Sequence, residues 1–201
     1  MHMFPLGRVL FPGEILPLHV FEPRYVTMMG EVLAGPREFG VVLIERGWEV
    51  GGADERTDVG CVAAVEDAVV LGEGQFAVVA RGTRRVRVET WLEDDPYPRA
   101  SVVPATDGAA FASDDLLDAL RQRLETVYAL ASELGADVTN SDLAPHGDRD
   151  AALWHYCSLA PVGDLDRQRL LASPSQVVRA ELLDSLLVDL VDELTLRLGE
   201  S

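Results

Sequence analysis

The chain has 201 residues and a formal net charge of −17, and its 17 basic residues are all arginine. Such a surplus of carboxylates repels the phosphates of nucleic acids, so the charge argues against a general DNA or RNA binder. Because the sequence contains no lysine, it excludes a Walker-type phosphate loop, a Ser–Lys dyad and Schiff-base chemistry within these residues.

Length and cysteine content indicate the class of protein. A chain of 201 residues forms one large domain or two small ones. Cys61 and Cys157 are too few for a disulfide framework. No apolar run approaches the roughly 18 residues of a membrane span, and the N-terminus lacks the pattern of a signal peptide. We therefore expect a reduced, cytoplasmic protein that does not bind membranes.

The amino-terminal stretch predicts two strands and a helix. Two short apolar runs, Val9 to Phe11 and Ile15 to Phe21, flank a turn at Pro12-Gly13. Pro23 suits the first position of a helix, because its φ is fixed near the helical value and it needs no N–H partner there. Apolar residues at helical spacing continue this helix to about Leu33, before Gly35-Pro36 ends it.

Residues 39–103 are predicted to form β-strands separated by turns and one loop. Residues 45–58 are polar and glycine-bearing and predict a loop. Gly82 and Thr83 are predicted to break a strand, and the alternation after them places arginines on one face and valines on the other. Closely spaced strands of this kind predict a small closed or half-closed β-barrel of about six strands with one short helix. The predicted strands beyond the opening stretch are residues 39–44, 59–70, 75–80, 84–91 and 97–103.

The second half of the chain predicts four helices. Residues 106–112 form a linker of small residues, and Ser113 is positioned to cap a helix that ends at Gly135. Residues 136–150 predict a loop. Further helices are expected at residues 151–159, at residues 164–172 and from Ser173-Pro174 to the end of the chain. The predicted fold class is α+β, with a β-barrel at residues 1–105 and a helical bundle at residues 106–201.

These motifs together resemble the amino-terminal substrate-binding domain of Lon proteases. The resemblance is carried by Phe4-Pro5-Leu6, by Val9-Leu10-Phe11-Pro12-Gly13, by residues 16–25 (LPLHVFEPRY), and by Phe39-Gly40, residues 60–63, 82–88, 97–100 and 165–171 in the expected order. It implies a PUA-like barrel followed by a helical bundle, a part that selects unfolded or tagged polypeptides and has no catalytic residues. We therefore expect a non-enzymatic, stand-alone substrate-binding module that serves a protease or chaperone, since the chain ends at Ser201.

Several polar residues in the chain have both a structural and a functional interpretation. Glu22 and Arg24 are expected to form an ion pair at the strand–helix corner, and His19 is expected to be a hydrogen-bonded histidine. Cys61 beside a histidine could form a nucleophile–base pair, although no third group is aligned behind it. The histidines and cysteines do not follow zinc-ligand spacing, so we expect no metal, no cofactor and no catalytic residue. The residues considered for metal were His155, Cys157, Cys61 and His146.

One arginine cluster stands out in this acidic chain. Arg81, Arg84, Arg85 and Arg87 either line a solvated strand face and pair with glutamates such as Glu89 and Glu93, or bind an acidic segment or short nucleic-acid element of a partner. Arg84, Arg85 and Arg87 are the candidate partner-binding residues. They are also the only support for an alternative function, a PUA-like module that binds RNA or a small ligand.

Overall fold

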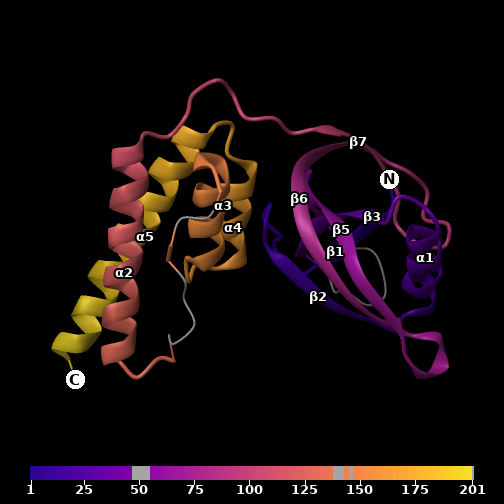
Figure 1. Cartoon of the computed structure of the whole chain (residues 1–201), viewed down its shortest axis with the longest axis horizontal. Helices are drawn as coiled ribbons and strands as arrows, with labels where there is room; N and C mark the ends of the chain where they lie inside the picture. Colours follow the sequence, from indigo (N-terminus) through magenta and orange to yellow (C-terminus); the bar gives the residue numbers. More distant parts are fainter. Residues whose placement is uncertain (47–54, 138–142, 145–146, 201) are drawn as a thin grey trace. The chain divides into compact units, whose positions relative to one another are not determined.

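The computed structural model describes residues 1–46, 55–137, 143–144 and 147–200. These residues form two compact units, Met1–Thr106 and Asp107–Ser201, and each is described by itself (Figure 1). Among the described residues, no helix has both the length and the apolar content that a membrane crossing requires.

In the first unit, the described residues form a mixed sheet of seven strands and one α-helix, α1 (Pro23–Ala34). The strand order is β1-β3-β5-β6-β2, while β4 pairs with β3 and β7 pairs with β6. Among the strands that the structure describes, β1 and β3 pair in parallel and the other pairs are antiparallel. The strands are β1 (Met3–Leu6), β2 (Ile15–Val20), β3 (Glu38–Arg46), β4 (Glu55–Arg56), β5 (Val59–Val70), β6 (Phe76–Trp91) and β7 (Ala100–Pro104), with a 3-10 turn, η1 (Gly72–Gly74), before β6.

The fold class agrees with the α+β prediction. The sheet has seven strands where about six were predicted, and one of the strands that the sequence did not predict is the short β4. β4 lies within residues 45–58, which the sequence predicts to be a loop. The pairing of its two residues with Ile44 and Arg46 explains why so short a segment forms a strand. Residues 47–54 of the predicted loop lie outside the described part of the chain.

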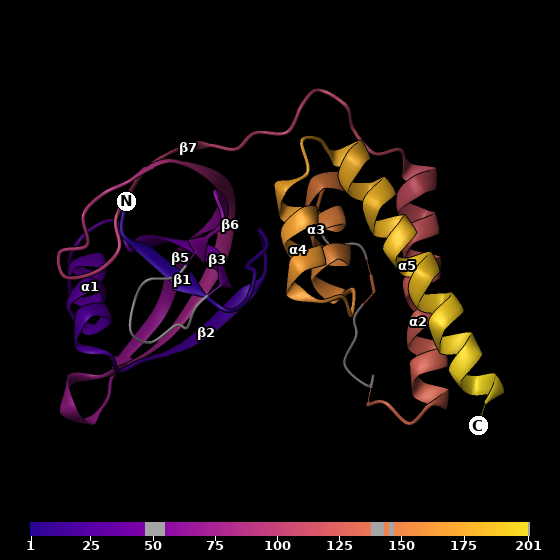
Figure 2. The ribbon, with the colours of Figure 1, turned by 180° about the vertical axis from the view of Figure 1, so that it is seen from behind.

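Backbone hydrogen bonds close the sheet into a barrel. The amide of Met3 donates to the carbonyl of Pro98 at 2.9 Å, and the amide of Ala100 donates to the carbonyl of Met1 at 3.1 Å. The segment that leads into β7 therefore joins the beginning of β1 to the end of β6. Figure 2 shows the ring from behind. These hydrogen bonds pair the edge of β1 at its beginning, while the rest of that edge and the outer edge of β2 stay unpaired with each other.

The predicted break at Gly82 is wrong, because β6 runs without interruption through this residue. A Cβ atom at Gly82 would lie 2.1 Å from the carbonyl oxygen of Phe11, so the glycine permits a close approach of two backbones. The amide of Gly82 donates to Glu14 at 2.9 Å, and the amide of Gly13 donates to Gly82 at 2.8 Å. The glycine therefore holds the turn before β2 against β6.

The predicted strand at Val9 to Phe11 is also wrong. These residues are almost fully buried, but the strand is β1, which ends at Leu6. The backbone turns here: Glu14 donates its amide to the carbonyl of Phe11 at 3.1 Å, and its carboxylate accepts from the Phe11 amide at 3.0 Å. The run is apolar because its side chains are buried, and residues 9–11 are not part of a strand.

The barrel core joins the inner faces of the strands to α1. Tyr25, Met28, Met29 and Val32 of α1 are buried against it, and the Phe4 ring stacks on Tyr25 with centroids 4.2 Å apart. These α1 residues recur at helical spacing, which explains the single apolar face of the helix. The helix begins at Pro23, as predicted.

The described residues of the second unit form four helices: α2 (Asp114–Glu133), α3 (Arg149–Leu159), α4 (Asp164–Ala172) and α5 (Gln176–Gly199). Ser113 caps α2 as predicted, by accepting from the Leu116 amide at 3.2 Å. Asp148 caps α3 in the same way. The last helix is capped by Ser175, two residues after the predicted start. Residues 138–142 and 145–146 of the predicted loop lie outside the described residues.

A buried arginine anchors this unit. Arg179 of α5 is 0% exposed; it donates to Asp107 at 2.6 Å and to the Leu170 carbonyl at 3.3 Å. Its guanidinium lies 3.6 Å from the centroid of the Trp154 ring. A buried charge is tolerated when it is paired and hydrogen-bonded, so this arginine ties the start of the unit to three helices.

Gly82→Ala is expected to destabilise the barrel by about 2–3 kcal/mol, since the methyl group meets backbone atoms that cannot turn aside. Gly72→Ala is the matched control, because nothing lies within 4 Å of its Cβ position. Equilibrium unfolding in urea measures both changes. Equal stability of the two variants would show that the approach of Phe11 does not require a glycine.

Candidate functional site

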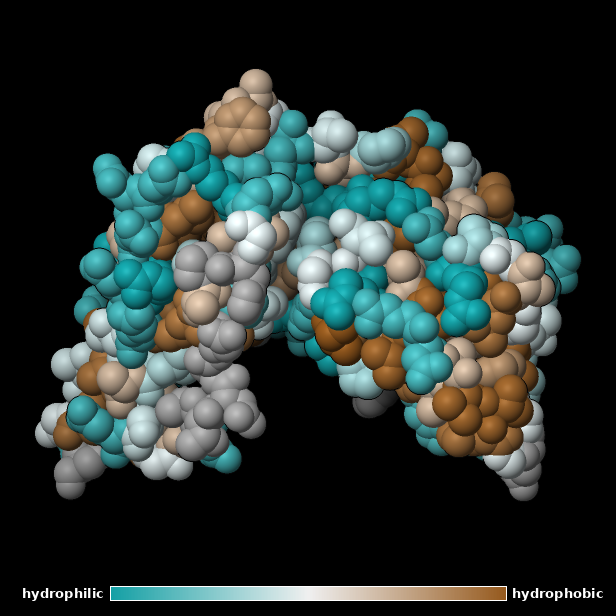
Figure 3. Space-filling model, in the orientation of Figure 1, coloured by the Kyte–Doolittle hydropathy of each residue, from teal (hydrophilic) through white to brown (hydrophobic). Residues whose placement is uncertain are grey.

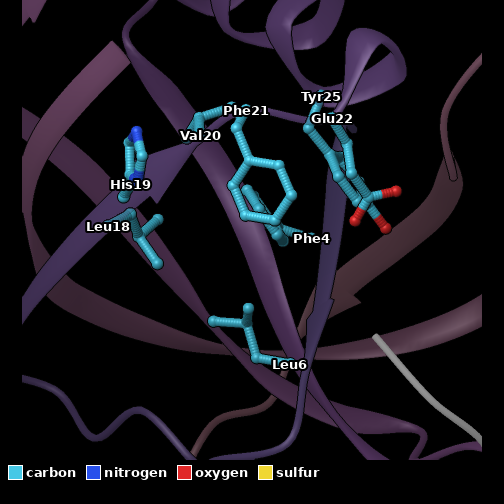
Figure 4. A pocket seen from close by; sticks show the side chains of 8 residues that line it. All are labelled: Phe4, Leu6, Leu18, His19, Val20, Phe21, Glu22 and Tyr25. Atoms are coloured by element: carbon cyan, nitrogen blue, oxygen red, sulfur yellow. The ribbon is translucent and has the colours of Figure 1, made fainter. Parts of the chain in front are cut away.

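A pocket of about 110 Å³ opens between β1 and β2, the two strands at the ends of the sheet order (Figure 4). Strand β1 supplies two of its side chains, β2 supplies three, and the rest come from the corner leading into α1. The lining residues are Phe4, Leu6, Leu18, His19, Val20, Phe21, Glu22 and Tyr25. The pocket thus lies in a seam where these two strands do not pair with each other.

Each strand at the seam carries a proline. In β1, the His2 carbonyl accepts from Gly40 of β3, so strand alternation turns the backbone of Pro5 away from β3. In β2, the Glu14 carbonyl accepts from Gly82, so the same alternation turns Pro17 away from β6. Proline has no N–H and fits only such an unpaired edge. An added strand would lack these donors, so a ligand in the seam depends on side-chain contacts.

The pocket has an apolar wall and a polar rim. Phe21 is 55% exposed, although Val20 before it is buried. On the rim, the Nε2 atom of His19 lies 2.8 Å from the Oε1 atom of Gln75, within hydrogen-bond distance. The structure therefore agrees with the prediction of a hydrogen-bonded histidine, here one on the surface.

The predicted ion pair at the strand–helix corner is present. Arg24 donates from Nε to Glu22 at 3.1 Å, and its guanidinium lies 4.6 Å from the centroid of the Tyr25 ring. Both charges are therefore engaged with near neighbours. The pair lies where the chain leaves β2 and enters α1, between Phe21 and Tyr25 of the pocket lining.

Exposed apolar residues also lie at the end of the β5–β6 hairpin, whose strand β6 pairs with β2 of the pocket. Val20 pairs with Phe76, which pairs with Val70; Val70 is 65% exposed and Leu71 is 40% exposed. Figure 3 shows apolar surface gathered over this end of the hairpin. We call the pocket together with Val70 and Leu71 the seam surface. A contiguous apolar patch on a soluble protein marks an interaction site more often than isolated apolar residues do.

The arginine cluster does not present three free cations. Arg84 donates twice to Glu38, at 2.8 and 2.7 Å, and this hydrogen bonding lowers the pKa of the Glu38 carboxyl. Arg85 is buried at 8% exposure, whereas Arg87 is exposed. Arg81 pairs with Glu66.

These pairs differ from the predicted ones. Glu66, which binds Arg81, comes from β5, the strand next to β6 in the sheet, where cross-strand neighbours lie close together. Glu38, which binds Arg84, comes from β3, so this pair spans the intervening strand β5. Glu89, one of the predicted partners, instead accepts from Ser101 at 3.4 Å. A partner-binding role for Arg84, Arg85 and Arg87 stays a prediction.

The cysteines are placed as core residues. Cys61 and Cys157 are each 0% exposed, and burial raises the pKa of each thiol to about 12. Thiolate formation is therefore strongly disfavoured at both positions. They lie in different units. Within the described ranges no group of three or more His, Cys, Asp or Glu is arranged to hold a metal ion; His146 lies outside these ranges.

Comparison with known proteins identifies the relatives of the chain. Residues 1–189 match the family model of the ATP-dependent protease La (LON) substrate-binding domain. Lon protease 1 of Herpetosiphon aurantiacus is 25% identical over 183 residues, which cover 85% of this chain and 22% of that protein. Lon protease 2 of Sorangium cellulosum is 31% identical over 136 residues, which cover 64% of this chain and 16% of that protein. The chain therefore spans about a fifth of the length of these curated relatives.

Solved structures agree with this result. A Lon N-terminal domain protein from Xanthomonas campestris has a TM-score of 0.60 and 26% identity, and the match covers 91% of this chain and 95% of that one. The N-terminal domain of the Mycobacterium avium complex Lon protease has the same TM-score of 0.60 at 16% identity and supports the fold. The resemblance predicted from the amino-terminal motif is confirmed.

Sequence reasoning missed the seam surface itself. The motif from Leu16 to Tyr25 was visible, but a continuous apolar run does not tell which of its members is exposed. One signal could have been used: Pro5 and Pro17 each mark a strand edge that is not paired. Taken together, they indicate where the sheet is open.

We expect both thiols to resist modification in the folded protein. At pH 8 a thiol with a pKa of about 12 is ionised in roughly one molecule in ten thousand, and the surrounding core excludes reagent. The measurement is the rate of reaction with Ellman's reagent. The urea-unfolded chain is the control, and both of its thiols should react promptly. Rapid reaction of one thiol in the folded protein would restore the hypothesis of a cysteine nucleophile.

Proposed function

Because the chain belongs to the family of ATP-dependent protease La (LON) substrate-binding domains, we propose that it is a non-catalytic module that binds unfolded or tagged polypeptides. The single observation that carries the proposal is the seam surface, an apolar pocket whose lining includes the exposed Phe21, together with the exposed end of the hairpin. Burial of such side chains against a ligand is the main source of affinity for apolar segments.

The shape of the seam surface indicates the kind of ligand. The pocket of about 110 Å³ admits one or two side chains and is too small for a folded partner. Val70 and Leu71 extend the apolar area beyond it. Because Pro5 and Pro17 remove donors at the two edges, recognition rests on apolar side chains with little dependence on the backbone ladder. This suits a module that accepts many sequences.

The rest of the proposal concerns partners and chemistry. The bound polypeptide would be passed to a protease or chaperone, in a cytoplasmic setting, and no reaction would occur on this chain. The buried thiols and the absence of lysine support a non-catalytic role. The alternative of RNA binding draws little support, since Arg84 is held by Glu38 and Arg85 is buried.

Replacing Phe21 with serine is expected to weaken the binding of an apolar peptide by about tenfold, because burial of a phenylalanine contributes about 1.5–3 kcal/mol. Val70→Ser should act in the same direction with a smaller effect. The measurement is fluorescence anisotropy with a labelled twelve-residue peptide of glycine and serine that carries two phenylalanines and a leucine. A peptide with serine at these three positions is the matched probe.

Leu196→Ser is the control variant, because Leu196 is 70% exposed and lies on α5, outside the barrel. It should bind as the unaltered chain does, and all three variants should unfold at similar urea concentrations. Equal binding by Phe21→Ser and Leu196→Ser, or no binding of the apolar peptide at roughly 50 μM, would overturn the proposal.

A further inference from the structure

A second pocket, of about 280 Å³, lies in the helical unit between the first turns of α2 and the face of α3. Asp114, Leu117 and Asp118 lie at helical spacing on α2, so they share one face. Ala152 and Tyr156 are four residues apart on α3 and share the facing side. All five line the pocket, together with Asp148 before α3.

The floor of this pocket is apolar and contains one unused polar group. Leu117, Ala152 and Tyr156 are 8%, 4% and 2% exposed. Tyr156 lines the pocket, and its hydroxyl forms no hydrogen bond with any residue that the structure describes. Because the largely buried Tyr156 side chain lines the pocket and its hydroxyl has no partner among the described residues, this group is available to a ligand. Burial raises the pKa of Tyr156, and the hydroxyl therefore stays protonated.

The rim of the pocket carries an excess of negative charge. Asp114 forms an ion pair with Arg149, and Asp148 caps α3 by accepting from the Ala151 amide at 3.0 Å. Asp118 is exposed and forms no ion pair within the described part of the chain. Three carboxylates and one guanidinium leave a net charge of −2 at the rim. A ligand of positive charge is therefore favoured.

The apolar floor and the acidic rim together favour an organic cation over a metal ion. A bare metal ion needs several converging oxygen ligands, and the described residues contain no group of three or more His, Cys, Asp or Glu arranged in that way. An organic cation fits better, because an aliphatic stem covers apolar surface while its charged end meets a carboxylate. The chain has no lysine of its own to occupy the pocket.

We propose that this pocket binds a primary ammonium or guanidinium group carried on an aliphatic stem. The stem lies on Leu117, Ala152 and the Tyr156 ring; the cation pairs with the carboxylate of Asp118 and donates a hydrogen bond to the Tyr156 hydroxyl. Such a group is supplied either by a lysine or arginine side chain of a polypeptide or by a small free amine. The site goes beyond the proposed function, because it lies in the other unit and uses charge in place of apolar burial.

The test titrates the full ¹⁵N-labelled chain with N-acetyl-lysine amide and follows the amide resonances of Leu117, Asp118, Ala152 and Tyr156. N-acetyl-norleucine amide, which keeps the stem and lacks the ammonium group, is the matched probe. We expect saturable shifts with the lysine compound at millimolar concentrations and none with the norleucine compound. Asp118→Asn should weaken binding several-fold, because it removes the carboxylate that pairs with the ammonium group. Tyr156→Phe should weaken it by a smaller factor.

Asp189→Asn is the matched control, because it removes the same charge from an exposed position on α5. If Asp189→Asn weakens binding as much as Asp118→Asn, the lysine compound responds only to the overall charge of −17, and the site is rejected. It is also rejected if the norleucine compound shifts the same resonances equally.

A second titration distinguishes the two sources of the cation. A glycine–serine decapeptide with one central lysine should bind more tightly than N-acetyl-lysine amide if the ligand is part of a polypeptide, and less tightly if the pocket admits only a small free amine. Either result supports the cation site. Phe21→Ser should leave both titrations unchanged, so a failure of the seam surface and a failure of this pocket are separately visible.

Discussion

The barrel depends on the close approach of two backbones at Gly82. The carbonyl of Phe11 occupies the space that a side chain at this position would fill, at 2.1 Å from the site of a Cβ atom. Because the glycine has no Cβ, β6 passes this point in an extended conformation and remains a single strand from Phe76 to Trp91. The turn between β1 and β2 is thereby fixed against the middle of the longest strand in the described unit.

The length of β6 explains why the sheet has a seam. One edge of β6 pairs with β5 along most of its length, while the other edge is divided between β2, at residues 76–81, and β7, at residues 86–91. The segment before β7 then pairs with the beginning of β1 and completes the ring. β2 is left with one partner, and its other edge faces the pocket. The candidate site is thus a consequence of sheet topology.

The sequence predicted the elements better than it predicted their contacts. Helix starts were readable at Pro23 and Ser113, because proline and capping residues act on the backbone nearby. Gly82 was misread, since a glycine that allows a close approach looks the same in sequence as one that ends a strand. Arg85 is buried although residues 84–87 pair regularly with β5 and place it on the same face as exposed Arg87, so alternation alone did not predict its burial. The exposure of Phe21 likewise depends on the tertiary structure.

Because all basic residues of the chain are arginines, several of its positive charges are held in contacts within the fold. Arginine forms bidentate and stacked contacts that lysine cannot replace, and arginines in both units are used in this way. Arg84 holds Glu38 with two hydrogen bonds, Arg24 lies over Tyr25, and Arg179 lies over Trp154. These positive charges are engaged within the fold, while acidic residues outnumber arginines by two to one. The remaining carboxylates therefore set the sign of the surface potential, which favours basic ligands and disfavours polyanions.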